Sequence, residues 1–159
     1  MDKITTIEME VKLAKHFNYK QNLIVPNISW GLYLNHNTLH ECDLLVLTTS
    51  NYLWEIEIKI SKSDLIADKK KWHGHHNPNI KRLYFAIPEY LKDCIEHIPD
   101  RAGIIIVKNK YRCEQIRKPR IDKGYQLTDK EKLKMAILGS MRIWALKKKI
   151  IKIKKANNS

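Results

Sequence analysis

The chain has 159 residues, of which 43% are hydrophobic and 30% are charged, proportions typical of one globular domain with its own core. It contains no apolar segment of the roughly 18 residues that a transmembrane helix needs. Its first residues lack a signal-peptide pattern, and its three cysteines are too few and too scattered for a disulfide framework. We therefore expect a cytoplasmic protein with no membrane partner.

The net charge of +13 is unevenly distributed. Residues 1–100 contain 12 Lys or Arg against 13 Asp or Glu, whereas residues 101–159 contain 18 against 4. A strongly basic segment favours a polyanionic partner, because each neutralised phosphate releases a counterion. The charge predicts DNA binding, with a merely well-solvated basic surface as the alternative.

The first half of the chain predicts a helix, three strands and a second helix. The first helix ends near Asn18, after which extended structure is expected around 23–25 and 28–34. Two strands follow at 43–49 and 52–60, joined by a short turn. Ser61 is typical of a helix cap and opens a helix to about Trp72. The apolar face of the first helix is predicted to consist of Ile7, Val11, Ala14 and Phe17.

The second half predicts a strand at 81–87, a helix at 88–95, a strand at 102–107 and a short strand at 111–116. A capping box then opens a last helix at Thr128, and a lysine-rich tail follows it. The inward residues of this helix are predicted to be Leu133, Ile137, Met141 and Trp144.

This order of elements predicts an α/β fold in which helices flank a mixed central sheet. We expect a core domain over residues 1–126 and a basic C-terminal helical extension over 127–159, as part of the same domain or as an appendage to it.

The strand at 52–60 carries the most informative pattern. Side chains alternate along a strand, so Glu55, Glu57 and Lys59 share one face. Asp43 begins the preceding strand and would lie beside Glu57 and Lys59 in a hairpin. Two carboxylates and an amine can hold a divalent cation and orient a water, which is the minimum chemistry for cutting a phosphodiester. The alternative is the solvated face of an amphipathic strand.

Asp43 followed by Glu57-Ile58-Lys59 resembles the motif of the PD-(D/E)xK nuclease superfamily, whose core has the same early order of elements. The chain resembles more narrowly the MmcB family of bacterial and phage DNA repair proteins, over about residues 5–107. Three segments carry this resemblance: 57–64, 83–88 and 102–107. The proline that usually precedes the aspartate is absent, since Cys42 stands there.

The resemblance implies a restriction-endonuclease-like core and a metal-dependent DNA endonuclease of repair, recombination or phage DNA metabolism. It implies Mg²⁺, with Mn²⁺ as a substitute, held by Asp43, Glu57 and the Ile58 carbonyl. Lys59 would stabilise negative charge on the phosphate. The first helix would add Glu10, with Glu8 as the rival. The alternative function is a catalytically inactive nucleic-acid-binding adaptor on the same fold.

Further residues are candidates for DNA contacts, although Ser61 is also explained by helix capping and the lysine tail could also lie on an anionic membrane. The His73–His76 segment lacks paired cysteines, so we interpret it as a polar loop rather than a structural zinc site. Its histidines could contact phosphate if the loop lies beside the active site. A homodimer would suit cleavage of duplex or branched DNA. The candidate DNA-binding residues are Ser61, Lys69, Lys147, Lys148 and Lys149.

Overall fold

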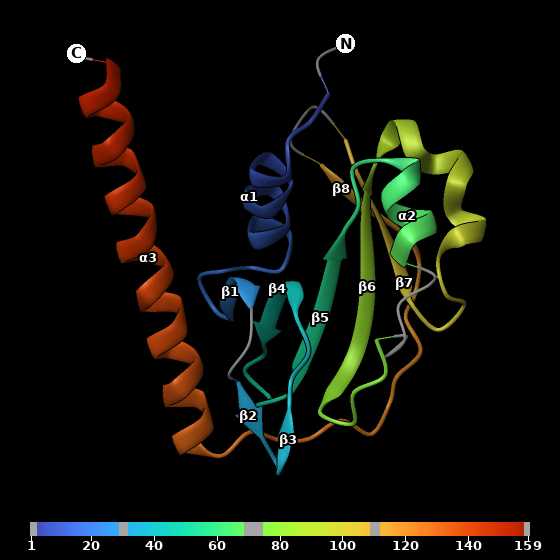
Figure 1. The fold of residues 1–159 in the computed structure, drawn as a ribbon. Coiled ribbons are helices and arrows are strands. Elements are labelled where there is room, and N and C mark those ends of the chain that lie inside the picture. The colour runs from blue at the N-terminus through green and yellow to red at the C-terminus, as the bar shows by residue number, and fades with distance from the viewer. Residues whose placement is uncertain (1–2, 29–31, 69–74, 109–111, 158–159) are drawn as a thin grey trace.

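The computed structural model describes residues 3–28, 32–68, 75–108 and 112–157. It has the predicted α/β architecture, with a six-stranded mixed sheet flanked by helices (Figure 1). Its helices are α1 (Thr6–His16), α2 (Lys62–Asp68), the 3₁₀ segment η1 (Glu89–His97) and α3 (Asp129–Asn157). Its strands are β1 (Leu23–Ile28), β2 (Tyr33–Leu34), β3 (Asn37–Thr38), β4 (Cys42–Leu47), β5 (Leu53–Ile58), β6 (Ile80–Pro88), β7 (Gly103–Val107) and β8 (Cys113–Arg117).

The strands of the main sheet are ordered β1-β4-β5-β6-β7-β8. Three adjacent strands, β5, β6 and β7, run parallel to one another, and every other neighbouring pair is antiparallel. Parallel neighbours need a crossover connection. Helix α2 lies in the connection between β5 and β6, and η1 lies in that between β6 and β7.

A separate β2–β3 hairpin corrects the single extended segment expected over 28–34. Leu34 pairs with Asn37 across a two-residue turn. Both turn residues, Asn35 and His36, have positive φ angles of 43° and 62°, as a type I′ hairpin turn requires. The apolar residues before the turn predict a strand, but the turn itself carries no glycine that would reveal the chain reversal.

The two faces of the sheet have different covers. Helix α1 covers one face, where Met9 and Leu13 pack on Ile56 and Ile58. The opposite face carries two apolar clusters. One lies under α2 and η1 and includes Leu65, Phe85 and Leu91, and the other lies between the hairpin and α3 and includes Leu34, Leu45 and Met135.

The predicted apolar face of α1 was wrong for its first half. Ile7 and Val11 are 63% and 66% exposed, whereas Met9 and Leu13 are buried together with the predicted Phe17. These three residues recur every fourth position and form a continuous stripe along one side of the helix. The side chains at positions 7 and 11 form a second stripe, and only packing against the sheet distinguishes the two.

The predicted inward face of α3 was also wrong. Its four residues, named above, are 51–61% exposed, whereas Met135 is fully buried. A Cβ added at Gly139 would lie 3.4 Å from Val25 Cγ2, and Arg142 Nη2 donates a 2.6 Å hydrogen bond to the Asn27 carbonyl. The helix therefore lies against β1 with the side on which glycine permits close approach.

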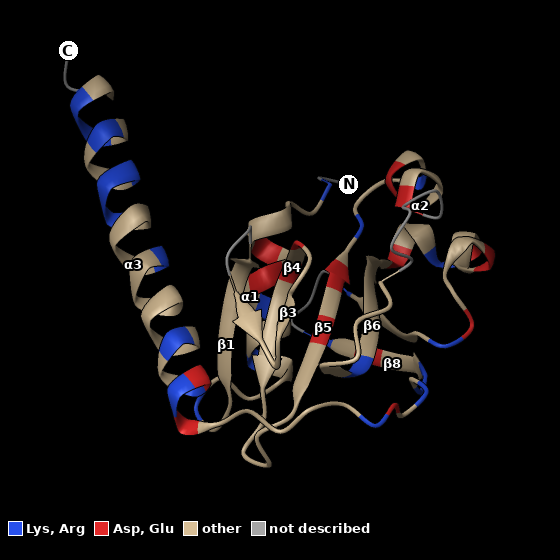
Figure 2. Ribbon diagram, turned by 60° about the horizontal axis from the view of Figure 1, so that its bottom comes forward, with Lys and Arg blue, Asp and Glu red and all other residues tan. Residues whose placement is uncertain are grey.

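Helix α3 continues through the lysine-rich tail, and its last turns extend away from the sheet (Figures 1 and 2). Its first half belongs to the core, since Met135 packs in the same cluster as Val25. Within the described part of the chain, no helix combines the length and the apolar character needed to cross a membrane.

The packing of α3 predicts different effects for two neighbouring substitutions. Met135→Ala should lower the free energy of unfolding by about 2–5 kcal/mol, because it leaves a cavity in a closed cluster. Leu133→Ala should change it by less than about 0.5 kcal/mol, since that side chain is 61% exposed. Urea denaturation of both variants measures the difference, and a larger loss for Leu133→Ala would contradict this helix orientation.

Candidate active site

A buried polar row crosses the face of the sheet opposite α1. Glu55, Glu57 and Lys59 share this face, as their alternation predicted, but they are only 0%, 1% and 6% exposed. Glu55 lies opposite Leu45 of β4 and beside Leu83 of β6. The polar row thus separates the two apolar clusters of this face, and the alternative of a solvated strand face is wrong.

Lys59 is the centre of an ion-pair network. Its Nζ lies 2.7 Å from Glu57 Oε2, 2.9 Å from Asp68 Oδ1 and 3.8 Å from Asp43 Oδ2. Asp68 is the last residue of α2, whose Leu65 packs into the apolar cluster beside Phe85. The crossover helix therefore brings a third carboxylate to the predicted pair.

The charge state of this network follows from its geometry. Burial alone would lower the pKa of Lys59, but the charge of Glu57 and hydrogen bonds to Asp68 and Glu57 raise it well above its usual value. Burial raises the pKa of Glu57, and Lys59 opposes that shift while Asp43 and Glu55 add to it. Lys59 is thus an ammonium ion at neutral pH, in contact with crowded carboxylates.

Asp43 lies where β4 begins and is the most accessible of the three motif residues. Its side chain is 36% exposed, and its Oδ2 accepts a 2.8 Å hydrogen bond from the Ile58 N–H. The paired register of β4 and β5 ends at Leu44 and Ile56. Beyond this point the Asp43 side chain, in place of a backbone carbonyl of β4, accepts the hydrogen bond from Ile58. The structure thereby brings Asp43, Glu57 and Lys59 together.

The two glutamates of α1 occupy different environments. Glu8 forms a capping box with Thr5, in which its Oε2 accepts the Thr5 N–H at 2.7 Å. Glu10 Oε1 accepts a 3.2 Å hydrogen bond from Asn27 Nδ2. Burial raises the pKa of Glu10, the Asn27 bond opposes this shift, and the negative charge of Asp43 adds to it. The negative charge of Asp43 therefore acts on Glu10, whereas Glu8 caps the start of α1.

Two histidines that the motif did not include complete the site. His75 Nδ1 lies 2.8 Å from Glu55 Oε1, and its Nε2 lies 2.7 Å from Asp68 Oδ2. His40 Nε2 lies 2.8 Å from the same Glu55 oxygen. The polar His73–His76 segment hinted at His75, but no local pattern connects Asp68 or His40 with the motif, because they approach it only through the fold.

These contacts change the charges of both partners. Burial would lower the pKa of His75, but hydrogen bonds to Asp68 and Glu55 raise it to about 9. Burial would raise the pKa of Glu55, but His40 and His75 lower it below its usual value. The fully buried Glu55 is therefore a carboxylate at neutral pH.

The predicted DNA-binding residues that the structure describes lie in two places. Ser61 caps α2, since its Oγ accepts the Asp64 N–H at 3.2 Å and lies 2.9 Å from Ser63 Oγ. Lys69 lies outside the described residues. The three lysines of the tail, Lys147, Lys148 and Lys149, are exposed on the projecting half of α3.

The burial of Lys59 predicts a large stability effect. Lys59→Met keeps the aliphatic volume but leaves Glu57 and Asp68 without their ammonium partner, and should cost about 3–5 kcal/mol of unfolding free energy. Lys62→Met, on the exposed start of α2, is the control and should change it by less than about 0.5 kcal/mol. Chemical denaturation measures both, and equal stabilities would show that the network contributes nothing.

A solved structure shares the fold of this chain. A solved structure of a protein of unknown function from Silicibacter pomeroyi is 20% identical and superposes with a TM-score of 0.62, covering 92% of this chain and 94% of that one. At this identity the likeness concerns the fold alone. A search of curated proteins finds no match.

The model of the family described as DNA repair protein MmcB-like matches residues 34–149. The match thus begins later than the resemblance noted in the sequence and extends into α3. It includes Asp43, Glu57, Lys59, Asp68 and His75. Since it spans well over half of the residues, the chain belongs to the MmcB-like family of DNA repair proteins.

Proposed function

We propose that this protein is a metal-dependent DNA endonuclease that hydrolyses phosphodiester bonds during DNA repair. The observation that carries the proposal is the convergence of Asp43, Glu57 and Lys59, with Lys59 Nζ 2.7 Å from one carboxylate and 3.8 Å from the other. The family described as DNA repair proteins supports the biological context.

The donor set fits a hard divalent cation. The pKa of Glu57 is raised by burial and, despite Lys59, by the nearby charges of Asp43 and Glu55, and that of Glu10 is raised by burial and by Asp43. A bound cation would relieve this repulsion between carboxylates. Asp43, Glu57 and the Ile58 carbonyl would hold Mg²⁺ or Mn²⁺, with Glu10 nearby. Such a cation supplies an activated water and Lewis-acid assistance.

Lys59 would act on the phosphate as a fixed positive charge. Its ammonium group remains protonated because carboxylates surround it, so it is a poor general base. Its contact with Glu57 holds it beside the metal-binding carboxylate, and the 2.9 Å contact with Asp68 restrains it from the other side. Asp68 is thus a positioning residue, and Lys59 would stabilise charge that develops on the phosphate oxygens.

One observation favours the alternative function of an inactive DNA-binding adaptor. Glu57 is 1% exposed and already pairs with Lys59, so its carboxylate would have to turn towards a cation. In an adaptor, Asp43 and Glu57 would serve only the stability of the fold. The two functions differ in whether removing the accessible Asp43 carboxylate changes anything besides stability.

Substitution of Asp43 tests the nuclease directly. Asp43→Asn should reduce Mg²⁺- or Mn²⁺-dependent cleavage by at least about 100-fold, because it removes a charged metal ligand. Mutation of residues that only support the ligands of a metal site already lowers metal affinity or activity by about 10–100-fold. Duplex, single-stranded and branched DNA are incubated with pure full-length protein. Binding of each DNA, measured in Ca²⁺ by fluorescence anisotropy, should be retained.

Glu41→Gln is the matched control. Glu41 is exposed and lies two residues before Asp43, and its substitution removes the same charge without touching the site. If wild type cleaves DNA and Asp43→Asn cleaves it equally well, Asp43 is not the metal ligand proposed here. Absence of cleavage on every DNA with either metal, together with tight DNA binding, would establish the adaptor instead.

The exposed half of α3 would hold the DNA. The whole helix carries ten Lys or Arg residues against two acidic ones, and Figure 2 shows them along a segment that extends away from the sheet. A projecting basic helix can follow a phosphate backbone while the body presents the site. Its interactions with the DNA would be largely independent of base sequence.

Removing three of these charges should change the salt dependence of DNA binding. The combined change of Lys147, Lys148 and Lys149 to Gln should make the negative slope of log K against log salt less steep, by up to about 0.9 for each phosphate that the protein no longer neutralises. The control changes Lys15, Lys20 and Lys92, which are exposed on the body, to Gln. Equal slopes for both triple variants would exclude α3 as the phosphate-binding element.

A further inference from the structure

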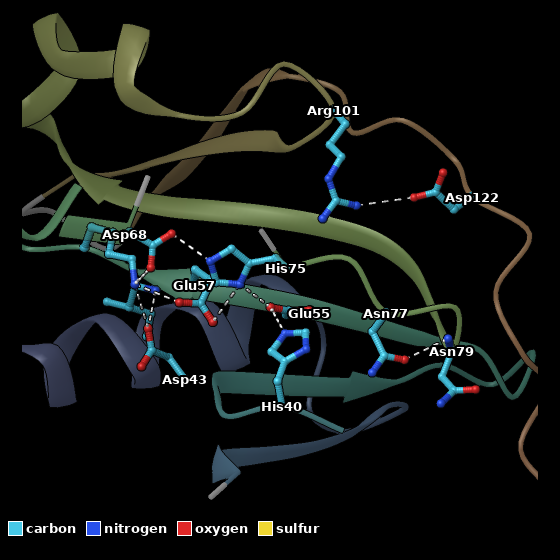
Figure 3. Close-up of polar contacts among 12 residues, drawn as sticks. His40, Asp43, Glu55, Glu57, Asp68, His75, Asn77, Asn79, Arg101 and Asp122 are labelled. Carbon is cyan, nitrogen blue, oxygen red and sulfur yellow. Dashed lines mark hydrogen bonds and ion pairs between the residues drawn. The ribbon is translucent and has the colours of Figure 1, made fainter. Parts of the chain in front are cut away.

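A second group of potential ligands lies beside the proposed nuclease site. His40, Glu55 and His75 each offer one ligand atom, and these atoms lie within 4.8 Å of one another. Both imidazoles approach Glu55 Oε1 at 2.8 Å, and their rings are steeply inclined, at 73°, with centroids 5.6 Å apart. Figure 3 shows the two histidines converging on Glu55.

We propose that His40, Glu55 and His75 form a binding site for a divalent transition-metal ion such as Zn²⁺, separate from the Mg²⁺ site at Asp43 and Glu57. The ligands would be His40 Nε2, a Glu55 carboxylate oxygen and His75 Nδ1. The proposal concerns metal binding and does not depend on nuclease activity.

The type of donor atom selects the metal. Imidazole nitrogen binds Zn²⁺ and related transition ions well, whereas Mg²⁺ prefers oxygen ligands. Two histidines and one glutamate are also the ligand set of many zinc sites that keep a fourth position open for water or substrate. The side chain of His40 is 13% exposed, while Glu55 and His75 are almost fully buried. His40 would therefore form the entrance to the site.

Two further features are typical of a built metal site. His75 Nε2 lies 2.7 Å from Asp68 Oδ2, and metal-bound histidines usually donate their second N–H to a carboxylate in this way. Glu55 is completely buried, and among the described residues its Oε2 has no hydrogen-bond partner. A buried carboxylate oxygen without a partner is costly, and a cation would satisfy it.

A competing set of ligands fits less well. Glu57, Asp68 and His75 also bring ligand atoms within 4.8 Å of one another. However, Lys59 Nζ lies 2.7 Å and 2.9 Å from those two carboxylates, so a metal there would have to compete with two close ion pairs. Of the proposed Mg²⁺ carboxylates, only Glu57 forms such a close pair, since Asp43 lies 3.8 Å from Lys59 Nζ. At the set that includes His40, coordination of His75 Nδ1 would replace its 2.8 Å contact with Glu55, and metal binding commonly releases protons from its ligands in this way.

The test is metal binding by the full-length protein after treatment with a chelator. Isothermal titration with Zn²⁺, and absorption spectroscopy with Co²⁺, both in excess Mg²⁺ to occupy the site at Asp43 and Glu57, should each give one ion per chain. His40→Ala and Glu55→Gln should weaken binding by at least about 100-fold, and Asp68→Asn by about 10- to 100-fold, because it only orients His75. His76→Asn is the control and should bind as wild type does, since His76 is the exposed neighbour of His75.

Folding and the two metal sites are separated by further measurements. Circular dichroism and thermal denaturation establish that each variant is folded, and the partly exposed His40 makes His40→Ala the decisive variant. Asp43→Asn should retain Zn²⁺ affinity even though cleavage is lost, so failure of the nuclease leaves this result unaffected. The absence of Zn²⁺ binding by wild type, or unchanged affinity in His40→Ala, would overturn the proposal.

Discussion

The position of one buried ammonium group governs the organisation of this protein. Lys59 is 6% exposed, and its Nζ lies 2.7 Å and 2.9 Å from carboxylates of β5 and α2. Burial of a single charge is costly, and removing one partner leaves the others uncompensated. The network therefore requires α2 to pack so that Asp68 reaches Lys59. The apolar contacts of Leu65 and Phe85 stabilise α2 in that position.

The polar row also divides the interior of the molecule. On one face of the sheet, α1 covers an unbroken apolar cluster, whereas on the other face Glu55, Glu57 and Lys59 separate two clusters. A continuous apolar face would bury more hydrophobic surface. Retention of charged residues there is the pattern expected where function rather than stability selects the side chains.

Charge has two distinct arrangements along the chain. At the site, the ammonium group of Lys59 and the carboxylates of Glu57 and Asp68 are buried together, so salt screens their interactions little. In α3, lysines are exposed and unbalanced, so their attraction for a polyanion is long-ranged and sensitive to salt. The first half of α3 packs on β1 through Met135 and Gly139. This packing ties the basic segment to the domain that carries the site.

The sequence by itself determined the order of the main elements, the capping residues and the convergence of Asp43, Glu57 and Lys59, because strand alternation and hairpin pairing are local rules. Its pattern did not determine which stripes of α1 and α3 are buried, since each helix offers two and the choice depends on the surface it meets. Nor did it place Asp68, His40 and His75 around Glu55 and Glu57. Those residues come from separate segments, and only the packing of α2 and the chain reversals around the sheet bring them within hydrogen-bond distance.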